Sequence, residues 1–541
     1  MKSSLVTARR VEGSHEGGTL SVATDAPGFP STPDPSYVEW YNAQLALLTN
    51  DALVAYKRVG GPDGMTLVPN LATSIPKPSD GGRTWTFQLR SGITYSDGTP
   101  VRPSDVPGSF ERAVIAGNAS AVGAGLFDYS GIIGSGSCGA KPPCDLSLGI
   151  EPDDGAGTVT FHLRQADLEF PAAITGAPIV PAGTPLGVSD LPLPATGPYM
   201  FSRFEAGHEA RLVRNARFRE WSKDAQPAGY PDEIVTTVSE IADPTAVVES
   251  GGADVAVADT QSTARLARLR TRAPAQLHVA PSQRTWFEMM NTRIPPFDDV
   301  RVRRAVNLAV DRKALVDAWG GPLAARITCQ VIPPEYAGFE RYCPYTVAPG
   351  SGGEWLAPDI AAARALLDEA GARGRPVNVW GIDDGGPHAG VARYFTDLLN
   401  RLGFRATTHL LETGAYFAFL ADHPEEVSMA GWWMRSVGRS GSDEIAGIFT
   451  CRGFPGYAYD GQPAGWCDPA LDTRIATALG LEATDPVAAN ALWAKIDAAI
   501  VDAAPAVMAF NPTDVVFVSE LVGGFAHHPI HLIMLDQLWV R

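Results

Sequence analysis

A histidine cluster near the C-terminus, formed by His527, His528 and His531, is the densest group of metal-binding side chains in the sequence. Two adjacent imidazoles and a near third could bind a metal ion such as zinc. No cysteine or carboxylate adjoins them, so we favour an ordinary solvated turn and expect no metal site.

A glycine-rich stretch, Gly134 to Gly139, formally matches the G-x-G-x-x-G pattern of nucleotide-binding loops. That pattern carries its meaning only where a helix follows directly. Here the sequence continues with Lys141-Pro142-Pro143-Cys144, which does not begin a helix. We therefore interpret the stretch as a loop closed by a disulfide and expect no cofactor.

Signatures of hydrolytic enzymes do not occur in the sequence. It contains no G-x-S-x-G nucleophile elbow, no phosphate-binding loop and no H-E-x-x-H motif. Acidic pairs are frequent, but a chain with 60 Asp and Glu residues contains such pairs by chance. Pairs without known geometry do not indicate glycosidase chemistry. We expect no catalytic residues and no enzymatic activity.

The six cysteines form three couples that are close in sequence, each among Gly and Pro residues: Cys138 with Cys144, Cys329 with Cys343, and Cys451 with Cys467. Zinc ligands more often show C-x-x-C spacing. Three local disulfides are the better interpretation, and they indicate an oxidising compartment. Six cysteines allow 15 connectivities, so the pairing of nearest neighbours rests on loop length alone.

The composition indicates a large, well-packed protein. The chain has 541 residues, of which 45% are hydrophobic and 19% charged, and its net charge of −17 argues against a nucleic-acid partner. No apolar run is long enough for a membrane helix. Residues 1–18 contain neither an apolar signal core nor a lipid-bearing cysteine. Either an export signal has been removed or the protein stays inside the cell, and the cysteines favour the first.

The stretch from Arg284 to Leu315 is predicted to form a buried strand followed by two helices. Arg284 to Met290 is aromatic and apolar, which predicts a buried strand, and Pro295-Pro296 ends it. Asp298 or Asp299 can then cap a helix whose buried face is formed by apolar residues at helical spacing, and Asp311 can cap a second helix.

The order and spacing of the residues in this stretch resemble a known family signature. The run N-T-x-x-x-P-F-D-D-V-R-V-R-x-A-V-N-x-A-V-D-R resembles that of the extracytoplasmic solute-binding proteins of ABC importers, family 5, which bind oligopeptides, dipeptides or nickel. Further segments resemble this family, among them 80–100, Ala195-Thr-Gly-Pro-Tyr199 and 243–255. Together they extend from about Gly18 to Val518.

The resemblance implies an α/β fold: a two-lobed periplasmic-binding-protein-like fold (type II, cluster C) with an extra inserted domain and a ligand cleft between the lobes. We expect a discontinuous first lobe formed by 18–50, 190–283 and 510–541. The inserted domain would comprise 51–189, and the second lobe 284–509. Strand–helix–strand patterns in 377–410 support an α/β second lobe.

The resemblance also indicates which residues would contact a ligand. They are Glu39, Trp40 and Tyr41 near the start of the chain, Trp432, Trp433, Met434 and Arg435 at the end of a strand, and Met508. Each aromatic residue among them could equally belong to the core. In oligopeptide binders of this family an Asp at the position of Arg435 pairs with the ligand's α-ammonium group. Arg435 reverses that charge and would favour an anionic or blocked group, unless Asp443 takes the role or Arg435 points to solvent.

The expected function is that of the substrate-binding protein of an ABC importer. It would capture an oligopeptide or peptide-like small molecule and deliver it to the transmembrane permease subunits. The protein would be a monomer outside the cytoplasm, either at the cell surface or secreted. The alternative is an enzyme or accessory protein of a natural-product pathway that has kept the fold, because fold does not determine function.

Overall fold

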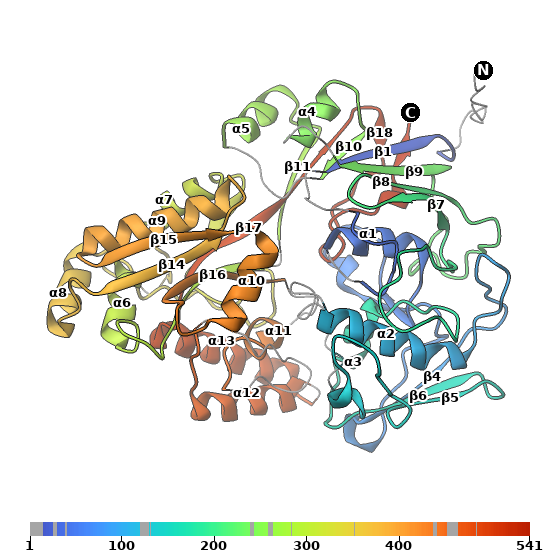
Figure 1. Cartoon of the computed structure of the whole chain (residues 1–541), viewed down its shortest axis with the longest axis horizontal. Helices are drawn as coiled ribbons and strands as arrows, with labels where there is room; N and C mark the ends of the chain where they lie inside the picture. The colour runs from blue at the N-terminus through green and yellow to red at the C-terminus, as the bar shows by residue number, and fades with distance from the viewer. Residues whose placement is uncertain are drawn as a thin grey trace. The chain divides into compact units, whose positions relative to one another are not determined.

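The computed structural model (Figure 1) describes residues 15–24, 30–37, 40–119, 129, 131–238, 243–257, 263–282, 284–350, 352–435, 441–451, 464–482 and 484–541. At 40–41, 118–119, 263, 433–435 and 443 it describes the backbone alone. The chain mixes helices and strands and divides into two compact units. The first comprises Met1–Asp259, Leu269–Ala280 and Asp514–Arg541, and the second comprises Thr260–Arg268 and Pro281–Thr513.

The first unit is built around a sheet in which the N-terminal strand is central. Strand β1 (Thr19–Thr24) pairs in parallel with β9 (Glu233–Val238) on one side and with β10 (Val255–Val257) on the other. Strands β8 (Glu209–Arg214) and β7 (Tyr199–Glu205) extend the sheet beyond β9. Strand β1 is buried because Leu20 and Val22 pack in the core of this unit.

Shorter elements complete the first unit. The helices are α1 (Trp40–Thr49), α2 (Val106–Ala119), α3 (Phe170–Ala173), α4 (Pro244–Glu249) and α5 (Thr263–Arg272), of which α5 begins in the second unit. The remaining strands are β2 (Val54–Tyr56), β3 (Leu67–Pro69), β4 (Thr84–Gln88), β5 (Ile150–Asp153), β6 (Thr158–His162), β11 (Leu277–Pro281), β18 (Val522–Gly523) and β19 (Trp539–Val540).

Residues 51–189 have a sheet and a core of their own within this unit. Strands β4, β6 and β5 form a separate three-stranded antiparallel sheet. Phe87, Phe110 and Phe161 are fully buried beside it. These features support an inserted domain over 51–189, although its boundaries stay a prediction.

The second unit is an α/β layer structure. Its sheet has the order β15 (Arg405–Leu411), β14 (Pro376–Ile382), β16 (Met429–Arg435), β12 (Arg284–Met290) and β17 (Ala506–Val518), and β13 (Ala325–Ile327) also pairs with β17. The helices are α6 (Val300–Ala309), α7 (Arg312–Trp319), α8 (Ile360–Ala370), α9 (Pro387–Leu402), α10 (Thr413–Asp422), α11 (Gly441–Ile445), α12 (Pro469–Glu482) and α13 (Pro486–Ala503). Helix α9 packs along β14 and β15, and α7 packs against α9 (Figure 1).

Aspartate caps begin four helices of this unit, and Asp299 and Asp311 lie where the sequence predicted caps. The side chain of Asp299 accepts a hydrogen bond from Arg301 N, and that of Asp311 accepts from Lys313 N and Ala314 N. Asp359 and Asp485 cap α8 and α13 in the same way. Each carboxylate satisfies backbone N–H groups that have no partner inside the helix.

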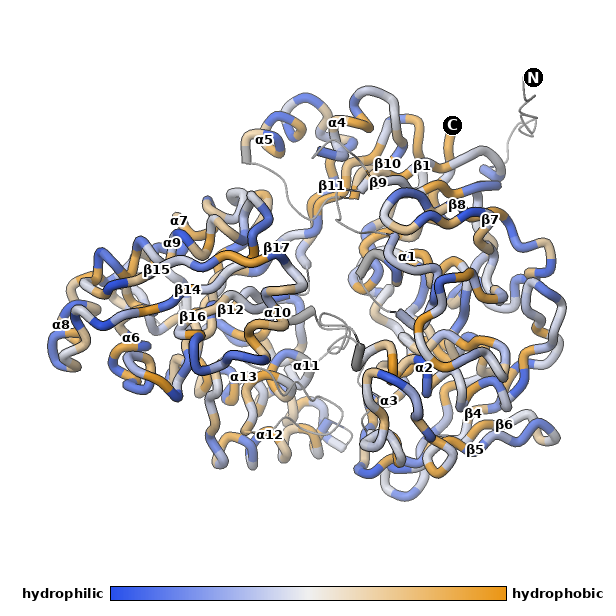
Figure 2. The backbone as a smooth tube through the Cα atoms, in the orientation of Figure 1, coloured by the Kyte–Doolittle hydropathy of each residue, from blue (hydrophilic) through white to orange (hydrophobic). Residues whose placement is uncertain are grey.

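Strand β17 contributes to both units. Its first half pairs with β12 inside the second unit, and its last residues, up to Val518, pair with β10 inside the first. All but one of its residues are buried, and hydrophobic residues predominate along it (Figure 2). Ala506–Val518 is thus one strand that has partners in both units.

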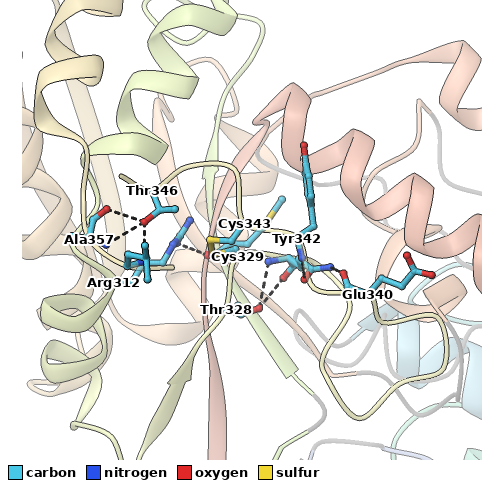
Figure 3. Close-up of a disulfide and its surroundings, with 11 residues drawn as sticks. Arg312, Thr328, Cys329, Glu340, Tyr342, Cys343, Thr346 and Ala357 are labelled. Carbon is cyan, nitrogen blue, oxygen red and sulfur yellow. Dashed lines mark hydrogen bonds between the residues drawn. A yellow bond between two sulfur atoms is a disulfide. The ribbon is translucent and has the colours of Figure 1, made fainter. Parts of the chain in front are cut away.

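The structure contains the three disulfides that the sequence favoured. The Cα–Cα distances are 4.5 Å for Cys138–Cys144, 5.2 Å for Cys329–Cys343 and 4.3 Å for Cys451–Cys467. Figure 3 shows the second of these in a loop of the second unit. Gln330, next to Cys329, accepts a hydrogen bond from Tyr342 N, so polar contacts hold this loop as well.

Among the residues that the structure describes, no helix is both long and apolar enough to cross a membrane.

Candidate functional site

The first predicted group of ligand contacts lies at the start of α1. Trp40 and Tyr41 are the first two residues of this helix, and only their backbone is described. Glu39 lies outside the described residues. Contact of this group with a ligand stays a prediction.

Two of the predicted contacts are packed in the core of the second unit. The exposed fraction is 4% for Trp432 and 2% for Met508. Both are register partners of Phe287, and the Trp432 ring lies 5.4 Å from that of Phe417. These side chains have a structural role in the core, and a ligand contact at either one stays a prediction.

The remaining predicted contacts form the end of β16. Trp433, Met434 and Arg435 pair in register with Trp286, Thr285 and Arg284 of β12. Only the backbone of these three residues is described, as is the backbone of Asp443 in α11. The backbone therefore places Arg435 at the end of a strand, as the sequence predicted.

A small cavity lies beside the same strand, at the carboxyl end of β14. In α/β sheets this edge is the usual location of ligand sites. The cavity has room for about one water molecule and is lined chiefly by Trp286, Glu288, Trp380, His388 and Tyr416. These side chains come from β12, β14, α9 and α10, so the fold brings together residues that are distant in sequence.

Glu288 is the buried charge-bearing group of this cavity. Its exposed fraction is 0%, and its register partners on the two flanking strands, Gly431 and Val507, carry no ionisable side chain. Its Oε2 atom accepts one long hydrogen bond, 3.4 Å, from Nε1 of Trp286, while no described residue donates to Oε1. Burial raises the pKa of Glu288 to about 8, because the surrounding protein solvates a carboxylate poorly.

His388 stands at the outer side of the cavity and is held by Asp384. Its Nδ1 atom lies 2.7 Å from Asp384 Oδ2, and its ring centroid lies 5.1 Å from that of Trp286. Partial burial alone would raise the pKa of Asp384. The hydrogen bonds from the His388 side chain and from backbone N–H groups at the start of α9 outweigh burial and lower it. Asp384 thus orients His388 while its other contacts cap the helix.

Gly431 makes room for the cavity. A Cβ atom added at this position would lie 2.6 Å from Cζ2 of Trp286 and 3.4 Å from Oε2 of Glu288. The carbonyl oxygen of Gly431 accepts a hydrogen bond of 2.6 Å from the hydroxyl of Tyr416. The absence of a side chain here therefore permits the close packing of the indole against the strand.

The histidine cluster near the C-terminus is part of a turn. His528 has an exposed fraction of 0%. Its Nδ1 atom accepts hydrogen bonds from Ile530 N and His531 N, and its Nε2 atom lies 3.0 Å from the carbonyl oxygen of Lys57. Both ring nitrogens of His528 lie within hydrogen-bond distance of backbone groups, which indicates a structural role. The expectation of a solvated turn was therefore wrong for His528, because its side chain is buried.

The lining of the cavity was missed at the sequence level, although one signal was present. The run Trp286-Phe287-Glu288-Met289-Met290 places one acidic residue inside a strand predicted to be buried. A charged residue in such a position is almost never fully buried without a reason. That conflict could have identified Glu288, whereas the contribution of His388 and Tyr416 depends on how helices pack on the sheet.

Comparisons with known proteins agree on one family. Residues 66–440 match the family model described as "Bacterial extracellular solute-binding proteins, family 5 Middle". The dipeptide-binding protein of Escherichia coli is 26% identical over 470 residues, which cover 81% of this chain and 78% of that protein.

Solved structures show the same fold. The clavulanic acid biosynthesis oligopeptide binding protein 2 has a TM-score of 0.79 and 25% identity, covering 97% of this chain and 96% of its own. A periplasmic binding protein of Helicobacter pylori in complex with the peptide STSA has a TM-score of 0.74 and 19% identity, covering 97% and 98%. The periplasmic-binding-protein-like α/β fold that the sequence predicted is thereby confirmed.

Proposed function

We propose that this chain, which belongs to the family 5 bacterial extracellular solute-binding proteins, captures a peptide or a peptide-like small molecule for an ABC importer. The observation that carries the proposal is the match of the family model over residues 66–440. The names of the relatives support it, because they include a dipeptide-binding protein and an oligopeptide binding protein. Peptide binders of this kind hold the ligand main chain by strand-like hydrogen bonds and leave room for varied side chains.

The partners follow from this role. The chain would act as a monomer outside the cytoplasm, at the cell surface or secreted, and pass its ligand to the transmembrane subunits of a permease. The disulfides support such a compartment, because they persist under oxidising conditions. As a binder, the protein would release its ligand chemically unchanged.

A second candidate function is compatible with one relative's name, although the comparisons taken together do not favour it. The clavulanic acid relative is named for a biosynthetic pathway, although it too is called an oligopeptide binding protein. An accessory or enzymatic role in natural-product biosynthesis would therefore be compatible with this fold. A neighbouring permease gene would favour transport, whereas turnover of a bound ligand would favour the biosynthetic role.

We also propose that Arg435 determines which ligand terminus is tolerated. It lies at the end of β16. By resemblance, its position matches that of the Asp that pairs with the α-ammonium group in oligopeptide binders of the family. A guanidinium repels an ammonium in a poorly solvated site and can bind a carboxylate with two parallel hydrogen bonds. The protein would then prefer a ligand whose N-terminus is blocked or anionic.

Calorimetry tests both the function and the role of Arg435. Peptides that differ only in a free or an acetylated N-terminus are titrated into the wild type and into Arg435→Asp. We expect saturable binding of one acetylated peptide per chain and weaker binding of the free amine, with the preference reversed in the variant. The absence of binding by any peptide would contradict the function. A requirement for the free amine that Arg435→Asp abolishes would contradict the role of Arg435 alone.

A further inference from the structure

The carboxylate of Glu288 lacks a counter-charge within its own unit. Apart from His388, the other lining residues are uncharged, and no described arginine or lysine side chain forms an ion pair with Glu288. They are aromatic (Trp286, Trp380, Tyr416), aliphatic (Ile382, Val391, Ala392) or glycine (Gly381, Gly431). On one side β16 presents Gly431, and on the other β17 presents Val507, neither of which can neutralise a charge. His388 is already engaged with Asp384 through Nδ1. A fully buried carboxylate in such surroundings is costly unless a cation or a hydrogen-bond donor joins it.

The cavity beside Glu288 has the size and walls that suit a small cation. It holds about one water molecule, which is also the size of an ammonium group. Trp286, Trp380 and Tyr416 contribute aromatic rings to its lining, and aromatic rings attract cations. The Trp380 ring is already stacked with those of His409 and Phe419, so Trp286 and Tyr416 are the rings left to contact a cation. Trp380 and His388 are only partly buried, so the cavity lies close to the surface of the unit. A planar guanidinium is larger and would not fit without rearrangement of the rings.

We propose that Glu288 and the aromatic cavity beside it form a subsite for one primary ammonium group of the bound ligand, an inference that rests on the proposed function. The subsite is distinct from the position of Arg435. Glu288 lies opposite Gly431 in the strand register, whereas Arg435 lies opposite Arg284, further along the same two strands. The ammonium group can come from a lysine-like side chain or from an α-amine, and the two sources are distinguished by experiment.

The experiment is calorimetry with four matched tripeptides: acetyl-Ala-Lys-Ala, acetyl-Ala-norleucine-Ala, acetyl-Ala-Arg-Ala and Ala-norleucine-Ala with a free amine. For the wild type we expect the acetylated lysine peptide to bind about tenfold or more tightly than its norleucine counterpart. The arginine peptide should lack this advantage because of its size. If instead the free-amine norleucine peptide has the advantage, the ammonium group that enters the cavity is the α-amine, and the preference for a blocked N-terminus proposed for Arg435 is contradicted.

Glu288→Gln is the decisive variant because it keeps the shape and removes the charge. We expect it to abolish the preference for the ammonium-bearing peptide, so that acetyl-Ala-Lys-Ala binds no more tightly than acetyl-Ala-norleucine-Ala. Glu369→Gln, at an exposed position of α8, is the matched control and should retain the preference. Equal binding of all four peptides by the wild type, or a preference that survives Glu288→Gln, would overturn the subsite and indicate a cavity that holds only water. If none of the four peptides binds the wild type, the proposed function itself is overturned.

A second measurement uses the wild type and does not depend on the folding of a variant. At pH 7 the buried carboxyl is mostly protonated when the cavity is empty, so binding of an ammonium group should release about one proton. Titrations in two buffers with different ionisation enthalpies measure this release. The other titratable groups facing Glu288 are His388 with its partner Asp384 on the α9 side and Tyr416 on α10. If the Glu288→Gln variant also releases a proton on binding, the proton comes from those other groups. That result would contradict the proposal that the Glu288 carboxyl releases it.

Discussion

Glu288 is the residue whose ionisation should be most visible in the stability of the protein. Its pKa is raised from 4.5 to about 8 by burial, so the folded state retains a proton that the unfolded state releases between these values. The unfolded state binds fewer protons in this window. The free energy of unfolding therefore falls as the pH rises from about 4.5 to about 8, and the loss is complete above that.

We expect Glu288→Gln to remove this part of the pH dependence. The stability of the variant relative to the wild type should rise with pH by up to about 1.4 kcal/mol per pH unit in the window and level off above pH 8. Urea unfolding curves between pH 5 and pH 9 measure the difference, and Glu369→Gln serves as the exposed control. If the difference in the free energy of unfolding between wild type and Glu288→Gln does not depend on pH, Glu288 is not a buried carboxyl without a counter-charge.

At the scale of elements, the glycine of β16 is the position where the close packing of strand and indole can be tested. We expect Gly431→Ala to destabilise the protein by about 1–3 kcal/mol, because the new methyl group would collide with Trp286. Gly480→Ala in α12 is the matched control. An added Cβ there meets no atom within 4 Å, so this change should be neutral or stabilise by at most about 1 kcal/mol. Equal effects of the two changes in denaturant unfolding would contradict the packing described here.

Elements were predictable wherever the signal is local. The caps Asp299, Asp311 and Asp359 act on N–H groups a few residues away, so sequence spacing identifies them. Strand β17 is formed by two apolar runs, Ala506–Phe510 and Val515–Val518, on either side of a short polar stretch.

The site was less predictable because it depends on tertiary packing. An apolar strand such as β16 does not reveal whether Trp432 faces the core or a ligand, and here it is in the core. The cavity beside Glu288 arises only when β12 and β16 pair in register and α9 places His388 over them.

For the whole molecule, the disulfides connect the fold to the compartment in which the protein works. We expect thiol titration of the unreduced, denatured protein to find no free cysteine. Reduction should lower the stability, with Cys329–Cys343 and Cys451–Cys467 each contributing about 3 kcal/mol because each closes a loop of about 15 residues. Replacing Cys138 and Cys144 by serine should cost less, since their loop is shorter. Six free thiols would contradict both the bonds and the extracytoplasmic location.

The central claim, that the protein is a peptide binder of an ABC importer, is tested most directly by native mass spectrometry of the chain incubated with a mixture of short peptides. We predict that the protein retains one peptide per chain and that the released peptide has its original mass. Retention of no peptide, or recovery of many equivalents of chemically altered peptide per chain, would contradict the account.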